Sequence, residues 1–124
     1  MVAKLAGAYM ERARLDIEAL GDAYARAAAE PAERGAEIER IAALAHDVEG
    51  QGGSFGYPLM SAIGASLSKF CRAAKRCEDD QLELIKTHID AMKAVIANRL
   101  EGNGGARGAE LIGLLRIANE KRRT

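Results

Sequence analysis

Apolar residues recur at spacings of three and four positions along most of the chain. This spacing predicts amphipathic helices, each with one buried stripe, because an α-helix turns once in 3.6 residues. No stretch alternates apolar and polar residues for long, so strands are not expected. The pattern is interrupted near Pro31, between Gly56 and Pro58, and near Asp80. Four helices with short connections predict an all-α fold, an up-and-down antiparallel four-helix bundle with an additional short C-terminal helix.

The breaks and stripes define the expected helices and their core. The first helix stops before Pro31, which fits as the first residue of the second helix. The fourth helix begins near Asp80, an N-cap candidate with Glu83 three residues on. The expected core consists of Leu5, Tyr9, Ala13, Ile17, Leu20, Tyr24 and Ala27; then Ile38, Ile41, Ala45, Val48 and Phe55, with Leu44 on the flank; then Met60, Ile63, Leu67, Phe70, Ala74 and Cys77; and finally Leu82, Ile85, Ile89, Met92 and Ile96.

The end of the chain differs in composition from the rest. A glycine-rich segment at residues 102–108 predicts a flexible linker after a bundle of residues 1–101. Residues 109–124 then predict an amphipathic helix whose apolar positions cover more than half of its circumference. Such a helix must bury that surface, and packing on its own bundle is the first expectation. A homodimer contact, or attachment to a membrane surface through the basic EKRRT end, are the alternatives.

Length and charge narrow the function classes. The chain has 124 residues, enough for one domain with a real core. Lysine plus arginine and aspartate plus glutamate number 18 each, so no global field recruits nucleic acid or an anionic membrane. No apolar run approaches a membrane span, and the start turns charged too early for a signal peptide. A cytoplasmic protein without a nucleic-acid or membrane partner is expected.

Three residues with possible chemistry have ordinary structural explanations. Cys71 and Cys77 lie six positions apart on one expected helix, about 240° apart around its axis. Side chains so placed cannot readily form a disulfide, so both cysteines are expected to be reduced and to pack in the bundle. His88 lies at the edge of the apolar stripe of the fourth helix, so it is expected to pack at the boundary of the core. No recognised metal-ligand spacing is present, so no metal is expected. The chain also lacks a glycine-rich nucleotide loop, which argues against autonomous kinase activity.

The other histidine, His46, lies in an unusual sequence context. His46 begins the stretch HDVEGQGGSFGYPL, which is rich in glycine although each glycine inside a helix costs about 1 kcal/mol relative to alanine. On a helical wheel His46 points roughly 140° away from the core, so the glycines leave a flat surface around it. A neutral imidazole there suits a partner that brings a phosphoryl group to the ring. An ordinary surface histidine, with glycines marking a helix end or close packing, is the alternative. Its expected neighbours on that face are Glu39, Ala42, Ala43, Glu49, Gly50 and Gly53.

The same stretch resembles the signature of histidine-containing phosphotransfer (HPt) domains, HxxKGxxxxxG. His46, Gly50 and Gly56 have the required spacing, and GGSFGY is similar to the phosphotransfer domain of chemotaxis histidine kinases. The resemblance implies a four-helix bundle whose histidine accepts a phosphoryl group from a receiver aspartyl phosphate, or from a sensor kinase, and passes it to another receiver.

The resemblance also implies roles for particular residues. His46 is the expected phosphoacceptor, and Gly50 leaves room for the docking receiver domain of a response regulator. This chain is expected to bind no cofactor, since the receiver supplies Mg²⁺. The expected docking face consists of Ala42, Ala43, Glu49, Gly50, Gly53, Ser68, Lys69 and Arg72.

Two positions depart from the family pattern. Glu49 replaces the usual lysine, and like charges about 4 Å apart repel by roughly 1 kcal/mol in water or 4 kcal/mol at an intermediate dielectric. Ser68 stands where relatives often place a glutamate or glutamine that bonds the histidine ring. Lys69 and Arg72 either restore positive charge or form an ordinary solvated face.

Three hypotheses follow from the sequence. The first is a phosphorelay protein that carries phosphate on His46. The second is an adaptor that docks a receiver without phosphotransfer, because Glu49 replaces the lysine. The third is a helical oligomerisation module that uses residues 109–118.

Overall fold

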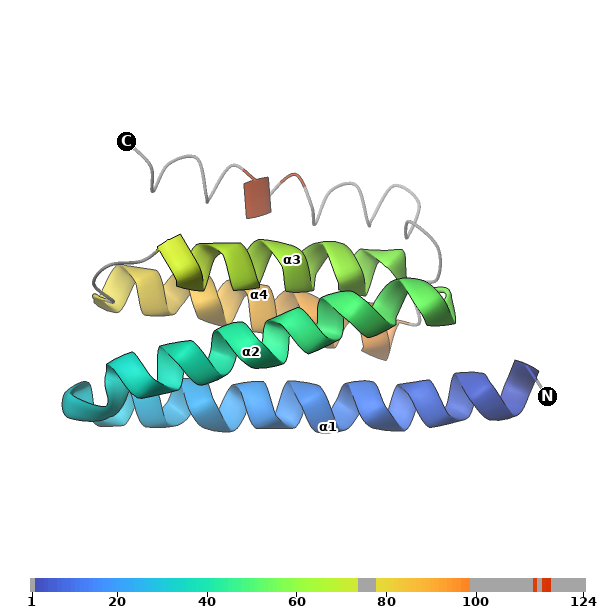
Figure 1. Cartoon of the computed structure of the whole chain (residues 1–124), viewed down its shortest axis with the longest axis horizontal. Helices are drawn as coiled ribbons and strands as arrows, with labels where there is room; N and C mark the ends of the chain where they lie inside the picture. The colour runs from blue at the N-terminus through green and yellow to red at the C-terminus, as the bar shows by residue number, and fades with distance from the viewer. Residues whose placement is uncertain (1, 74–77, 99–112, 114, 117–124) are drawn as a thin grey trace.

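The computed structural model of the chain describes residues 2–73, 78–98, 113 and 115–116, with the side chains described from residue 7 onward (Figure 1). Its regular elements are all helical over those residues. The four long helices are α1 (Val2–Ala29), α2 (Arg34–Gly52), α3 (Pro58–Ala73) and α4 (Asp79–Ala97). Two short 3₁₀ turns, η1 (Pro31–Glu33) and η2 (Gly53–Phe55), lie at the α1–α2 and α2–α3 connections.

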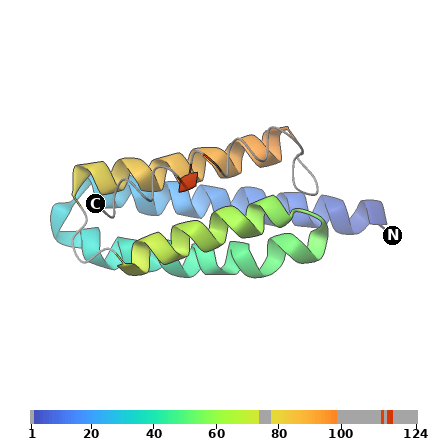
Figure 2. The same ribbon diagram turned by 90° about the horizontal axis from the view of Figure 1, so that it is seen from above.

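The four helices form an antiparallel bundle in which each helix packs against its neighbours in the chain. α2 makes its most extensive contact with α3, while α1 packs against both α2 and α4 (Figures 1 and 2). A smaller contact between α3 and α4 closes the bundle. The predicted all-α, up-and-down fold is therefore confirmed.

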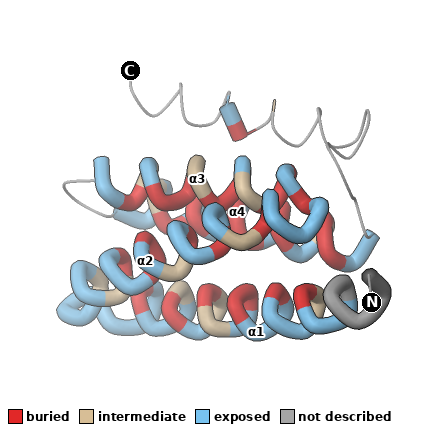
Figure 3. Tube along the Cα trace, turned by 45° about the vertical axis from the view of Figure 1, so that its right-hand side comes forward, coloured by how far each residue is buried: buried red, intermediate tan, exposed pale blue. Residues whose placement is uncertain are grey.

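The core consists of the apolar stripes that the sequence pattern indicates. Buried positions recur along all four helices (Figure 3). Fully burying one large aliphatic side chain stabilises the fold by about 1.5 to 3 kcal/mol, so these stripes hold the bundle together. The largest fully buried side chains are Leu20, Ile41, Met60, Ile63, Leu67, Ile85, Met92, Val95 and His88.

Phe55 is the clear exception among the expected core residues. It is 40% exposed because α2 ends at Gly52 and Phe55 belongs to the following 3₁₀ turn. The expected core positions Tyr24 and Phe70 are partly buried, as is the flanking Leu44. Ala74, Cys77 and the side chain of Leu5 lie outside the described residues.

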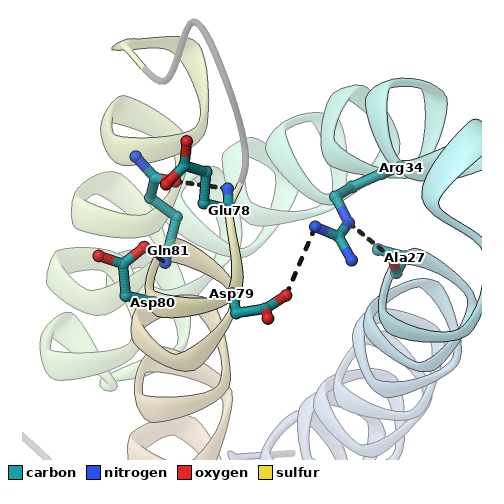
Figure 4. Close-up of polar contacts among 6 residues, drawn as sticks. All are labelled: Ala27, Arg34, Glu78, Asp79, Asp80 and Gln81. Carbon is teal, nitrogen blue, oxygen red and sulfur yellow. Dashed lines mark hydrogen bonds and ion pairs between the residues drawn. The ribbon is translucent and has the colours of Figure 1, made fainter.

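The starts of α2 and α4 differ from the sequence prediction. Pro31 begins the 3₁₀ turn, and α2 follows from Arg34, whose Nε donates a hydrogen bond of 3.0 Å to the carbonyl of Ala27 near the end of α1 (Figure 4). The predicted N-cap Asp80 is wrong, because Glu78 caps α4 and its backbone N–H donates to the side-chain oxygen of Gln81. Asp80 instead lies in the first turn, where a carboxylate is favourable near the helix N-terminus.

The C-terminal segment is described at three residues. Gly113, Leu115 and Arg116 are helical, and Leu115 is buried as part of the core cluster. At Leu115 the chain therefore packs on its own bundle. The rest of the predicted linker at 102–108 and helix at 109–124 lies outside the described residues, and the homodimer stays a prediction. No helix in the described part is long and apolar enough to cross a membrane.

His88 lies inside the core rather than at its boundary. It has no exposed surface, and its Nδ1 lies 2.7 Å from the carbonyl of Leu84, so Nδ1 carries the proton and donates it. Nε2 then accepts a hydrogen bond of 2.9 Å from the hydroxyl of Ser66, and the ring stacks on Phe70. Burial lowers the pKa of His88, although the bond to Leu84 opposes this shift. The bundle thus holds a neutral imidazole.

This environment predicts that acid destabilises the bundle. The unfolded chain binds a proton at His88 more readily than the folded chain does, so the free energy of unfolding falls as the pH drops below about 6.5. Urea unfolding between pH 8 and 5.5 measures the effect, and His88→Gln should flatten the dependence. His46→Gln is the control, since it removes an exposed histidine. An equal slope in wild type and His88→Gln would contradict the prediction.

Candidate functional site

His46 projects from the outer side of α2. Its side chain is 63% exposed, whereas Ala45 and Val48 face the core. This orientation confirms the exposed position that the helical wheel predicts. The helix therefore presents an imidazole to solvent while its other side is held by the bundle.

Gly64 of α3 lies directly behind the turn of α2 that carries His46. A Cβ atom at Gly64 would lie 2.7 Å from the carbonyl oxygen of Ala45 and 2.8 Å from the backbone nitrogen of Glu49. Real Cβ atoms do not approach backbone this closely, so only glycine allows α3 to pack here without a shift. Gly64 is not among the site residues predicted from the sequence, although a glycine in the middle of an otherwise helical pattern is a signal of close packing.

The glycines after His46 have three different roles. A Cβ atom at Gly50 would meet nothing within 4 Å, so the surface there is open. A Cβ atom at Gly52 would lie 2.8 Å from both the Tyr57 carbonyl and the Ser61 nitrogen. Gly56 has a φ of 86°, which glycine adopts without strain. Access thus explains Gly50, while close packing and the helix end explain Gly52 and Gly56.

The turn after α2 is fixed by hydrogen bonds and ring stacking. The Ser61 hydroxyl donates to the carbonyl of Glu49 and accepts a bond of 2.9 Å from the backbone N–H of Gly53. The ring of Tyr9 in α1 stacks on Phe55 at 5.1 Å and on Tyr57 at 5.2 Å between centroids. These contacts tie the end of α2 to α3 and α1. Phe55, which sequence reasoning placed in the core, is an exposed aromatic ring at this end.

Glu49 is the charged neighbour of the His46 ring. Its Oε1 lies 3.6 Å from Nδ1 of His46, and the two side chains are 43% and 63% exposed. Among the described residues, no hydrogen bond or ion pair reaches the other ring nitrogen, Nε2. The ring therefore has one nitrogen beside a carboxylate and one open to an approaching group.

The other residues of the expected docking face divide into exposed and buried positions. Ala42 is buried, which corrects its place on the exposed face: α2 packs against both α1 and α3, so the buried arc is wider than the stripe of large side chains. Ser68 is also buried, and no hydrogen bond joins it to His46 in the described part of the chain. The exposed members are Ala43, Glu49, Gly50, Gly53, Lys69 and Arg72.

No metal-binding cluster occurs in the described part of the structure. No group of three or more histidine, cysteine, aspartate or glutamate side chains is placed to hold an ion there. Cys71 is a buried cysteine in α3, and Cys77 lies outside the described residues.

Comparison with protein families gives a match to the Hpt domain over residues 4–95. The chain belongs to the Hpt-domain family. The matched segment includes most of α1 and α4, all of α2 and α3, and His46. Comparison with curated proteins and with solved structures gave no significant match. Membership of this family implies involvement in a two-component phosphorelay, in which Hpt domains function with kinases and receiver domains.

The packing of the Hpt domain predicts opposite effects for two glycine substitutions near His46. Gly64→Ala should lower the free energy of unfolding by about 1 to 3 kcal/mol, because its Cβ meets the backbone of α2. Gly50→Ala should raise it by roughly 0.5 to 1 kcal/mol, because the site is open and alanine is the better helix former. Urea unfolding at pH 8 measures both. Equal effects of the two substitutions would show that α3 does not approach α2 as described.

Proposed function

We propose that this Hpt domain carries a phosphoryl group on Nε2 of His46 between receiver aspartates, or from a histidine kinase to a receiver, in the cytoplasm. The observation that carries the proposal is an exposed imidazole beside the open surface at Gly50. The close packing of α3 at Gly64 supports the same role, since it holds the α2 backbone in place while a partner docks on the other side.

The chemistry needs few groups from this chain. A neutral imidazole supplies the lone pair that attacks phosphorus, in line with the aspartate oxygen that leaves. The receiver supplies Mg²⁺, which neutralises charge on the phosphoryl oxygens, and so no metal site on this chain is required. The role of His46 is that of the nucleophile and carrier.

The surface around His46 is suited to a docking receiver. Ala43, Gly50 and Gly53 are exposed and carry at most a methyl group, so they present little steric obstruction. Lys69 and Arg72 are exposed on α3. We propose that these two cations face the acidic phosphorylation site of the receiver, which offsets part of the negative charge that Glu49 adds.

The second candidate is an adaptor that binds receiver domains without phosphate chemistry. The observation that favours it is the carboxylate of Glu49 at 3.6 Å from the His46 ring, where the family pattern has lysine. Both candidates bind a receiver domain, but only the carrier takes up phosphate from it.

The carrier hypothesis predicts that His46 is required for phosphate uptake. Receiver domains phosphorylated in the presence of Mg²⁺ should transfer one acid-labile phosphate to wild type and none to His46→Gln or His46→Ala. Intact-mass measurement detects the gain, with circular dichroism as the check that both variants remain helical. Phosphate on either His46 variant would contradict the carrier hypothesis. Receiver binding to wild type without any transfer would establish the adaptor instead.

Both candidates predict that a long side chain at Gly50 blocks docking. Gly50→Arg should weaken receiver binding at least tenfold, because the arginine occupies the open face of α2, whereas the fold tolerates it in open space. The matched control is Gly35→Arg, at a second exposed and open glycine of the same helix, about 22 Å away along the axis. Titration calorimetry measures both affinities. Equal binding by the two variants would place the docking surface elsewhere.

A further inference from the structure

We propose that Glu49 biases the phosphotransfer equilibrium away from phosphorylated His46 and toward the aspartyl phosphate of the receiver. This inference rests on the proposed carrier function and concerns the regulation of the same site. Under this proposal, phosphorylated His46 is a better phosphoryl donor to the receiver than it would be without the Glu49 carboxylate.

The geometry supplies a fixed charge beside the ring. Glu49 is one helical turn after His46, and its Oε1 lies 3.6 Å from Nδ1. Within the described residues, His46 is the one ion-pair partner within 4.0 Å of the Glu49 carboxylate. Lys69 and Arg72 are exposed on α3 and do not pair with it. No lysine or arginine of the described residues therefore forms an ion pair with Glu49.

The transfer step changes the charge beside Glu49. The lone pair of Nε2 forms the N–P bond while the P–O bond to the receiver aspartate breaks, and the aspartate leaves as a carboxylate with the bonding electron pair. At pH 8 the proton on Nδ1 passes to solvent, so the charges balance. His46 changes from a neutral ring to one that carries close to two negative charges. Glu49 then faces both the phosphoryl group and the lone pair of Nδ1.

The size of the effect follows from the exposure of the pair. Both side chains are about half exposed, so water and salt screen the repulsion. Phosphorylation adds close to two negative charges roughly 6 Å from the Glu49 carboxylate. In a medium close to water, their repulsion changes the equilibrium constant for phosphotransfer to His46 three- to tenfold. Such a bias leaves phosphate uptake measurable while favouring onward transfer.

The experiment compares phosphotransfer equilibria at pH 8 with one phosphorylated receiver domain and Mg²⁺. Wild type, Glu49→Gln and Glu49→Lys are mixed with the receiver at equal concentrations, and intact mass gives the phosphate on each protein. Glu49→Gln should raise the ratio of phosphohistidine to aspartyl phosphate roughly three- to tenfold. Glu49→Lys should raise it further, because the sign of the charge is reversed.

The matched control is Glu39→Gln, which removes the same charge from the same face of α2. Glu39 is exposed and lies two helical turns before His46, about 10.5 Å along the axis. That separation exceeds the screening length of about 8 Å at physiological salt, so the ratio should stay at the wild-type value. The difference between wild type and Glu49→Gln should also shrink at high salt, which a structural effect of the substitution would not do.

The possible outcomes separate this inference from the carrier proposal. Higher phosphohistidine in both Glu49 variants, with Glu39→Gln unchanged, supports it. Equal ratios in wild type and the Glu49 variants overturn it and leave the carrier function intact. Transfer to no variant, from any receiver that binds, refutes the carrier function and this inference with it. Transfer to Glu49→Lys alone overturns both, because a charge that blocks uptake by wild type is not a three- to tenfold bias, and it favours the adaptor instead.

Discussion

The close approach of α3 to α2 at Gly64 is the contact on which the site depends. Because a side chain at this position would run into the backbone of residues 45–49, the two helices can touch along their main chains only where glycine stands. Gly52 repeats the arrangement from the other helix, against Tyr57 and Ser61. The α2 turn that packs against Gly64 carries His46. Its position is therefore fixed by backbone packing rather than by partners of the imidazole itself.

With this arrangement one side of α2 packs against the bundle while the other side leaves His46 open to a partner. Gly50 and Gly52 are two residues apart, which places them about 200° apart around the axis. Gly52 faces α3 and permits close packing, whereas Gly50 faces solvent and leaves the His46 surface open. A run of glycines that weakens helix propensity therefore serves two requirements at once. The free energy lost in propensity is offset by the contact with α3 and by the stacking of Tyr9 on the following turn.

The sequence predicts those features that depend on large side chains and repeat along a helix. Stripes such as Ile38, Ile41, Ala45 and Val48 follow from periodicity, and so does the exposure of His46. Periodicity does not show where a second helix widens the buried arc, so Ala42 was misplaced. It also continues past the point where backbone geometry ends α2, which misplaced Phe55. The burial of His88 depends on Ser66, a partner on another helix.

The exposure of Glu49 decides how its charge acts on the site. A carboxylate buried beside a phosphorylated ring would repel it by several kcal/mol, about 4 kcal/mol at 4 Å with an intermediate dielectric, and would abolish the chemistry. The same pair in water repels by only about 1 kcal/mol. With 43% of the Glu49 side chain and 63% of the His46 side chain exposed, the pair lies near the aqueous limit. A relay histidine must release its phosphate as well as accept it, so a repulsion of this size is compatible with a carrier and adjusts its equilibrium.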